Sequence, residues 1–285
     1  MNARRMPRGR VGAFPAALAL ALQLALLAPP PASAQGLNLS GKSDQPIEIT
    51  ADNGIEWQQE NEVFLARGNA KAVRGDITVL ADELRAYYRN QQQGGGTEIW
   101  RLDAIGNVRI KTADDTAYGR HAVYQVDIGV LVLTGGKVKL VTPTDVITAD
   151  KQIEYWEQKQ MAVARGNAKA VRENKQLKAE VLAAYFRADR DKNENKLYRV
   201  DAFDNVTIVT EQDTATAERG VYNVESGIAT LTGSVKLTRG ETVLTGCRAV
   251  VNMNTSVSNL FSCPGSRERA KGTLMPKNLK LKKSE

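Results

Sequence analysis

The sequence predicts an all-β protein built from tandem repeats. The nine residues ARGNAKAVR at 66–74 return unchanged at 164–172, an offset of 98. Apolar and polar residues alternate along much of the chain, which is the period of a half-buried strand. Fixed-period repeats of this kind predict stacked units that share one core. We therefore expect roughly sixteen to twenty short strands and few helices.

The first 34 residues have the pattern of a secretory signal peptide. Four arginines precede an apolar run from Ala16 to Ala28, and Ala32-Ser33-Ala34 forms a small-residue cleavage site. An uncleaved anchor is the weaker alternative, because a spanning helix needs about 20 apolar residues. The mature chain is then expected to start at residue 35 as a soluble protein outside the cytoplasm.

Most of the positive charge lies at the two ends of the chain. Removing the four signal arginines from 39 basic residues leaves 35 against 32 acidic residues, a net charge of +3. The segment 267–285 carries seven Lys and Arg residues against two Glu. We interpret this tail as solvated, with attraction to an anionic lipid surface as the alternative. A nearly neutral body argues against nucleic-acid binding.

The repeat sets the expected domain organisation. ITAD at 49–52 returns at 147–150, and RLDAIGNVRI at 101–110 is echoed by RVDAFDNVTI at 199–208. We expect a lead-in at 35–46 and a continuous body at 47–263. The body contains repeat 1 (49–146), repeat 2 (147–243) and a truncated third repeat. A last short strand and the basic tail would occupy 264–285.

Pairs of turn-forming residues recur between the alternating segments. Gly, Asn and Asp tolerate positive φ, so we expect a tight two-residue hairpin turn at each pair. These pairs are Gly68-Asn69, Gly106-Asn107, Gly135-Gly136, Gly166-Asn167, Asp204-Asn205 and Gly233-Ser234. The segment ADELRAYY at 81–88 resembles a helical turn in isolation, but its echo AEVLAAYF favours a strand. The segments NQQQGGG (90–96) and ADRDKNEN (188–195) are expected to be exposed loops.

The two cysteines, Cys247 and Cys263, are expected to form a disulfide. An even pair in an exported protein favours a bridge. If Thr255 is the centre of the hairpin between them, the two cysteines face one another directly. Two unrelated buried thiols are the alternative.

Catalytic residues are scarce. ARGNAKAVR does not have the Lys-Ser/Thr of a phosphate-binding loop. His121 is the only histidine, and Arg219 occupies its position in the second copy. Nucleophilic triads and histidine or cysteine metal sites are therefore not expected. Asp52 and Asp150, and Asp103 and Asp201, recur in both copies, which leaves open a carboxylate enzyme acting on a polysaccharide. No cofactor is expected.

From SDQPIEITAD at 43–52 onward the chain resembles the OstA-like, LptA family of periplasmic lipopolysaccharide-transport proteins. The likeness continues through GNAKAV, GRHAVYQV, LVLTGGKVKL and the closing LTGCRAVVNMNTSVSNLFS. It covers nearly all of residues 43–276, and the order and spacing of the motifs carry it more than any one motif. The complete extra repeat and the cysteine pair depart from the family pattern.

The resemblance implies an elongated antiparallel β-jellyroll with an apolar interior groove for the acyl chains of lipopolysaccharide. It implies a location in the periplasm and a bridge from the inner to the outer membrane, formed by strand addition at exposed edges. The expected partners are an inner-membrane LptC-like protein at the N-terminal edge near Ile47 and an outer-membrane LptD-like protein at the C-terminal edge, 257–275. A head-to-tail homo-oligomer is also possible within this scheme.

Ten residues are expected to contact lipid. The resemblance places all ten at the family's inward positions or at their copies in the second repeat, and each has ordinary core packing as the alternative. They are Ile47, Ile49, Val108, Ile110, Tyr124, Val126, Val206, Ile208, Tyr222 and Val224. A polysaccharide-acting enzyme and a purely structural surface protein are the competing hypotheses for the whole chain.

Overall fold

The computed structural model describes residues 46–90, 96–189, 194–255, 257–265 and 269–273. All of them belong to one compact unit, residues 32–285. The predicted signal peptide, the lead-in up to residue 45 and the tail from 274 lie outside the described residues. So do positions 91–95 and 190–193 of the two predicted loops.

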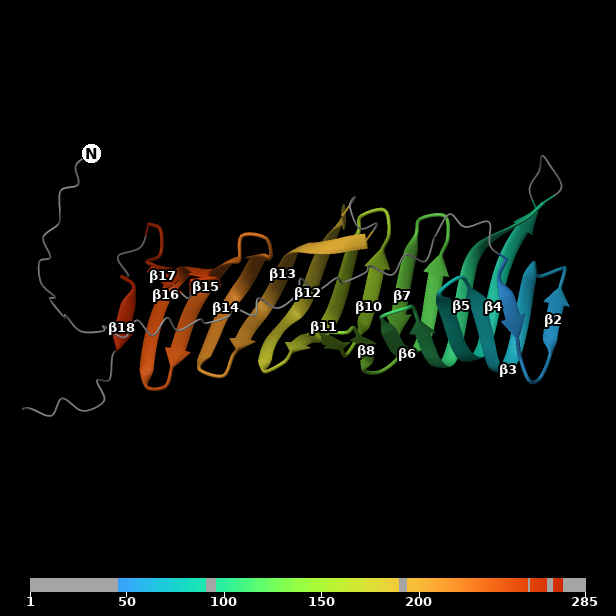
Figure 1. Ribbon diagram of the computed structural model, residues 1–285, viewed down its shortest axis with the longest axis horizontal. Helices are drawn as coiled ribbons and strands as arrows, with labels where there is room; N and C mark the ends of the chain where they lie inside the picture. Colours follow the sequence, from blue (N-terminus) through green and yellow to red (C-terminus); the bar gives the residue numbers. More distant parts are fainter. Residues whose placement is uncertain (1–45, 91–95, 190–193, 256, 266–268, 274–285) are drawn as a thin grey trace, which may run out of the picture. The chain divides into compact units, whose positions relative to one another are not determined.

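The described residues form one antiparallel sheet of 18 strands and contain no helix, which confirms the predicted fold class. Most strands pair with the next strand along the chain, as Figure 1 shows, and the exceptions are pairs that include short strands. The strands are β1 (Glu48–Thr50), β2 (Ile55–Gln58), β3 (Val63–Arg74), β4 (Ile77–Asn90), β5 (Thr97–Lys111), β6 (Thr116–Gln125), β7 (Val130–Thr134), β8 (Val138–Val141), β9 (Val146–Ala149), β10 (Gln152–Trp156), β11 (Met161–Arg172), β12 (Lys175–Asp189), β13 (Glu194–Val209), β14 (Asp213–Asn223), β15 (Ile228–Arg239), β16 (Thr242–Asn252), β17 (Val257–Phe261) and β18 (Lys271–Thr273).

Five of the six predicted hairpin turns are instead β-bulges inside long strands. β3 continues through Gly68-Asn69, and its register with β4 shifts between Arg67 and Ala70. Both residues of each pair have positive φ, as predicted. The prediction of a hairpin was wrong because positive φ suits a bulge as well as a turn. As a result many strands are long: β3 has 12 residues and β13 has 16.

Only Gly135-Gly136 falls between two strands, β7 and β8. Lys137 follows this pair, whereas in the second copy Val235 follows Gly233-Ser234 directly. The additional residue interrupts the first-copy strand, while the second-copy equivalent, β15, is continuous.

The bulges line up across neighbouring strands, and we call this line the crease. On one side, sheet half A contains β2, β7, β10 and β17; on the other, half B contains β1, β8, β9 and β18. The long strands cross from one half to the other. Leu84 and Leu133 of half A and Ile110 and Val138 of half B belong to one core cluster. The sheet is therefore folded along the crease with its apolar face inside.

The crease explains the alanines of ARGNAKAVR. Ala70 pairs with Ala81 directly beside the bulge, and Ala168 pairs with Ala179 at the equivalent place. Ala70 and Ala168 have no exposed surface, whereas Lys71 points outward and is exposed. Inside a fold of the sheet the side chains converge, so only small residues fit.

Both copies keep the same pairing. Val63 faces Tyr87 and Met161 faces Tyr185, and Arg101 faces Gln125 as Arg199 faces Asn223. ADELRAYY lies in β4 and AEVLAAYF in β12, so both are strands as predicted.

Candidate functional site

The structure places the residues predicted to contact lipid on or beside the inner face of the folded sheet. Val108, Ile110, Tyr124 and Val206 belong to the buried core. Ile49, Val126 and Ile208 are half-buried and pack against that core. These seven residues therefore form one apolar surface that extends over both copies.

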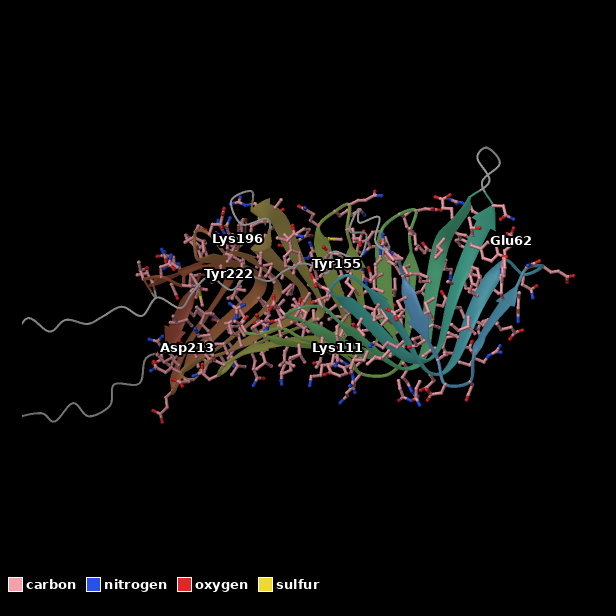
Figure 2. The ribbon with its side chains drawn as sticks, turned by 45° about the vertical axis from the view of Figure 1, so that its right-hand side comes forward. Glu62, Lys111, Tyr155, Lys196, Asp213 and Tyr222 are labelled. Carbon is pink, nitrogen blue, oxygen red and sulfur yellow. A yellow bond between two sulfur atoms is a disulfide. The ribbon has the colours of Figure 1, made fainter. Side chains whose placement is uncertain are left out.

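The other three predicted residues are half-buried. Ile47 directly precedes β1, and Tyr222 faces the buried Ala229 across β14 and β15. Val224 follows β14, and its N–H bonds to the carbonyl of Tyr198. Figure 2 shows Tyr155 and Tyr222 on their strands, with charged residues such as Glu62, Lys111 and Asp213 at the rims. The sheet thus separates an apolar inner face from charged rims.

An aromatic cluster at the N-terminal end of the inner face was not predicted. Trp57 on β2 stacks on Phe64 of β3, with ring centroids 5.4 Å apart, and Phe64 contacts Tyr88 at 5.1 Å. Trp57 Nε1 donates a hydrogen bond to Tyr88 Oη at 2.8 Å. Ile55 and Trp57 are 53% and 57% exposed. Because Ile55 faces Ala66 and Trp57 faces Phe64, both share the inner face.

The sequence contained a signal for this cluster. Ile55 and Trp57 alternate in IEWQ, directly after the predicted first strand, but our candidate set followed the family's inward positions and omitted them.

The C-terminal end is fixed by a disulfide between Cys247 and Cys263. The predicted pairing register was wrong by one residue, because Asn252 faces Val257 and Arg248 faces Phe261. Cys263 lies two residues beyond the end of β17, where the chain leaves half A for β18. The bridge therefore joins the edge of the sheet to β16 beside the crease.

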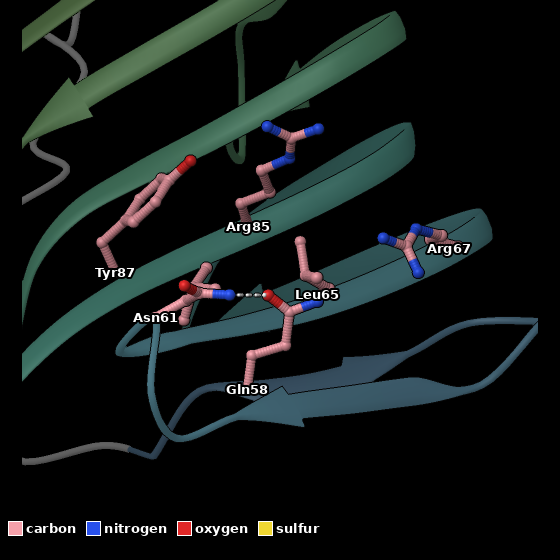
Figure 3. A pocket seen from close by; sticks show the side chains of 7 residues that line it. Gln58, Asn61, Leu65, Arg67, Arg85 and Tyr87 are labelled. Carbon is pink, nitrogen blue, oxygen red and sulfur yellow. Dashed lines mark hydrogen bonds between the residues drawn. The ribbon is translucent and has the colours of Figure 1, made fainter.

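A shallow pocket opens on the outer face of β2, β3 and β4 (Figure 3). Asn61 Nδ2 donates to Gln58 Oε1 at 2.9 Å at its rim. Arg67 is already paired with Glu56 and Glu83. None of the residues predicted to contact lipid lines this pocket, so the apolar inner face is the candidate site.

Comparison with known families agrees with this geometry. The model described as LptA/(LptD N-terminal domain) LPS transport protein matches residues 48–155 and again residues 146–257. The two matches follow the internal repeat and together cover more than half of the chain. The chain belongs to this LPS transport family.

Individual relatives of this family member are more distant. An uncharacterized protein of Rhizobium meliloti (strain 1021) is 29% identical over 109 residues, which are 37% of this chain and 57% of the relative. The match therefore spans little more than half of that relative. The crystal structure of LptH, the LptA-homologous periplasmic component of the lipopolysaccharide transport device of Pseudomonas aeruginosa, is 12% identical. That comparison covers 81% of this chain and 96% of LptH, with a TM-score of 0.21, and carries no argument below.

The LPS transport family consists of transport proteins, so this member is not an enzyme. The recurring carboxylates have structural partners. Asp103 accepts two hydrogen bonds from Arg101, at 2.6 and 2.9 Å, and Asp201 accepts the same pair from Arg199. Hydrogen bonding to these carboxylates raises the pKa of both arginines.

The second carboxylate pair supports the bulges. Asp52 accepts a hydrogen bond from Asn69 and Asp150 from Asn167. His121 is exposed on β6. Among the described residues, no group of three or more His, Cys, Asp or Glu side chains is placed to hold a metal ion. Within the same residues, no helix has the length and apolarity to cross a membrane.

Proposed function

We propose that the chain is a periplasmic bridge component that carries lipopolysaccharide from the inner to the outer membrane and shields the acyl chains against its inner face. Membership of the LPS transport family supports the lipid class. The predicted signal peptide supports the compartment. The polysaccharide enzyme loses its support, because its candidate carboxylates are occupied by Arg101, Arg199, Asn69 and Asn167.

The observation that carries the proposal is the continuous apolar inner face. Core residues line it in every long strand from β3 to β16. Each methylene removed from water contributes about 0.8 kcal/mol, so contact with part of one acyl chain offsets much of the cost of leaving a bilayer. Phosphate and sugar groups stay in water, because burying them without partners is costly.

The two ends of the sheet support the partner assignment. In the described chain β1 and β2 pair only with β3, and β17 and β18 pair only with β16. Each end therefore offers strand edges to which another chain can add. We assign the N-terminal edge to an LptC-like protein or a preceding copy, and the C-terminal edge to an LptD-like protein or a following copy.

Trp57 and Ile55 extend the inner face to the N-terminal edge. An exposed aromatic residue there gives an arriving acyl chain an apolar surface before it reaches the buried part. Trp57→Ala is expected to lower the rate of lipid transfer into the protein, whereas Glu56→Ala, outward on the same strand, leaves the rate unchanged.

Photo-crosslinking in cells tests the proposal. A crosslinker at Ile49 or Tyr124 on the inner face is expected to capture lipopolysaccharide, while one at outward Lys71 captures none. Capture from Lys71 alone would contradict it. Depletion of the protein is expected to leave newly made lipopolysaccharide at the inner membrane.

A further inference from the structure

The internal repeat allows two equivalent parts of the inner face to be compared. In half A the strands β6, β7 and β10 form one triplet, and β14, β15 and β16 form its second-copy equivalent. Tyr124 faces Leu131, which faces Tyr155, in the first triplet. Tyr222 faces Ala229, which faces Val251, in the second. We call each set of three an inner row.

The first inner row fills its own space. Tyr124, Leu131 and Tyr155 are 8%, 5% and 4% exposed. Burial raises the pKa of Tyr155 to about 12, which fits an apolar surrounding. In the second inner row a methyl group replaces the isobutyl group of Leu131, and an isopropyl group replaces the phenol of Tyr155. Tyr222 and Val251 are half-buried there.

The greater exposure of Tyr222 is not caused by a position at the end of the sheet. Tyr222 lies on β14, and β15, β16 and β17 all lie between it and the C-terminal edge of half A. Closer to the crease Leu260 of β17 faces Ala249 and packs against the core. The reduced side-chain volume is therefore confined to the inner row farther from the crease.

The residue at the rim beside the inner row also differs between the two triplets, and it is uncharged in the second. In the first triplet Tyr124 Oη donates to the carboxylate of Glu157 at 3.1 Å. Glu157 N–H bonds to the carbonyl of Gly129, and Met253 N–H makes the equivalent bond to Gly227. Met253, 45% exposed, therefore stands in the place of Glu157. A flexible thioether replaces a charge, which favours contact with an alkyl chain.

We propose that the second inner row, Tyr222, Ala229 and Val251 with Met253 at its rim, is the position where this protein holds an acyl chain of lipopolysaccharide. The first inner row is filled by its own side chains and acts mainly as core. This inference rests on the proposed function and locates its lipid contact in the second triplet. An acyl chain is the occupant because the row and its rim offer methyl, isopropyl and thioether groups and one aromatic ring. None of these four side chains is charged, and Arg172, which interacts electrostatically with Tyr222, is paired with Asp145.

A paired crosslinking experiment in the full chain tests the inference. Benzoylphenylalanine at position 222 is expected to capture purified lipopolysaccharide about tenfold more than at position 124, the equivalent of roughly two further buried methylene groups. Equal capture at the two positions, or more at 124, would overturn the inference.

Filling the second inner row provides a second readout. Ala229→Leu with Val251→Tyr, which restores the first-copy residues, is expected to lower capture at 222 about tenfold. Thr230→Leu, on the outer face of the same strand, is the matched control and keeps capture unchanged. Met253→Glu alters an exposed side chain only, so it tests the rim without risk to folding, and it is also expected to lower capture at 222. Unchanged capture with Met253→Glu would contradict the role of the rim.

The outcomes separate this inference from the proposed function. Capture at Ile49 together with equal capture at 222 and 124 removes only the inference. No capture from any inner position, with the protein folded, removes the proposed function as well.

Discussion

Asn167 Nδ2 donates a hydrogen bond to Asp150 Oδ2 at 2.8 Å, which joins the bulge of β11 to the link between β9 and β10 at the crease. Asn69 makes the same bond to Asp52 at 2.7 Å in the first copy. Asn167 has a φ of 45° and Asn69 a φ of 44°. One residue type thus provides both the left-handed backbone of the bulge and the side chain that ties it to its neighbour.

Asn167→Ala is expected to destabilise the protein by about 1–2 kcal/mol, because alanine loses the hydrogen bond and is strained at positive φ. Asn167→Gly loses only the bond and should cost less. Urea unfolding of the two variants measures the difference. If glycine costs as much as alanine, the backbone conformation does not matter at this position.

Asp115 is expected to make stability depend on pH. Its side chain is 4% exposed, and its Oδ1 has no hydrogen-bond partner. Burial raises its pKa from 3.8 to about 6, so the folded state is favoured at low pH and this contribution is lost as pH rises through about 6. Asp115→Asn is therefore expected to stabilise the protein at pH 7.5, by up to about 3 kcal/mol, and to have little effect at pH 4.

The equivalent Asp213 is the matched control for Asp115. It pairs with Arg239 at 2.6 Å, and hydrogen bonding to that guanidinium lowers its pKa. Its contribution is present at neutral pH and is lost as pH falls, so Asp213→Asn should destabilise the protein at pH 7.5. Thermal unfolding between pH 4 and 7.5 compares the variants. Destabilisation by Asp115→Asn at pH 7.5 would show that the buried carboxylate has a partner.

Asp201→Ala is expected to lower the free energy of unfolding by about 1–3 kcal/mol, because Asp201 is 4% exposed and accepts hydrogen bonds from Arg199. Lipid transfer is expected to stay unchanged, because this pair lies on the outer face. Asp103→Ala should behave alike, since Arg101 makes the same contacts. Chemical denaturation and a transfer assay measure the two quantities. Loss of lipid transfer in a variant that is still folded would show that this carboxylate has a functional role.

Removal of the disulfide by Cys247→Ser with Cys263→Ser is expected to destabilise the C-terminal edge. The cysteines are 16 residues apart, and a closed loop of about this size contributes about 3 kcal/mol. Hydrogen exchange should show β17 losing protection while β4 and β5 retain theirs. Equal loss across the sheet would mean that the bridge stabilises the whole unit.

Much of the architecture could be predicted because it depends on local periodicity. Alternation of apolar residues identified the strands, and the 98-residue offset identified two units of equal pairing. The inward direction of Val108 and Ile110 followed from the same alternation. The same alternation could not identify the aromatic cluster at Trp57 as a candidate lipid contact. The exposure of Trp57 depends on the absence of a further strand beside β2 in the described chain.

The sequence by itself determined the fold class, the repeat, the disulfide partners and the membership of a lipid-transport family, since all four follow from spacing along the chain. Only the tertiary structure decided that Gly68-Asn69 and its copies are bulges and not turns. A positive φ is a property of one residue, whereas a bulge exists only when a neighbouring strand continues past it. For the same reason Ala229 and Val251 became a candidate lipid position only when strand pairing brought them next to Tyr222.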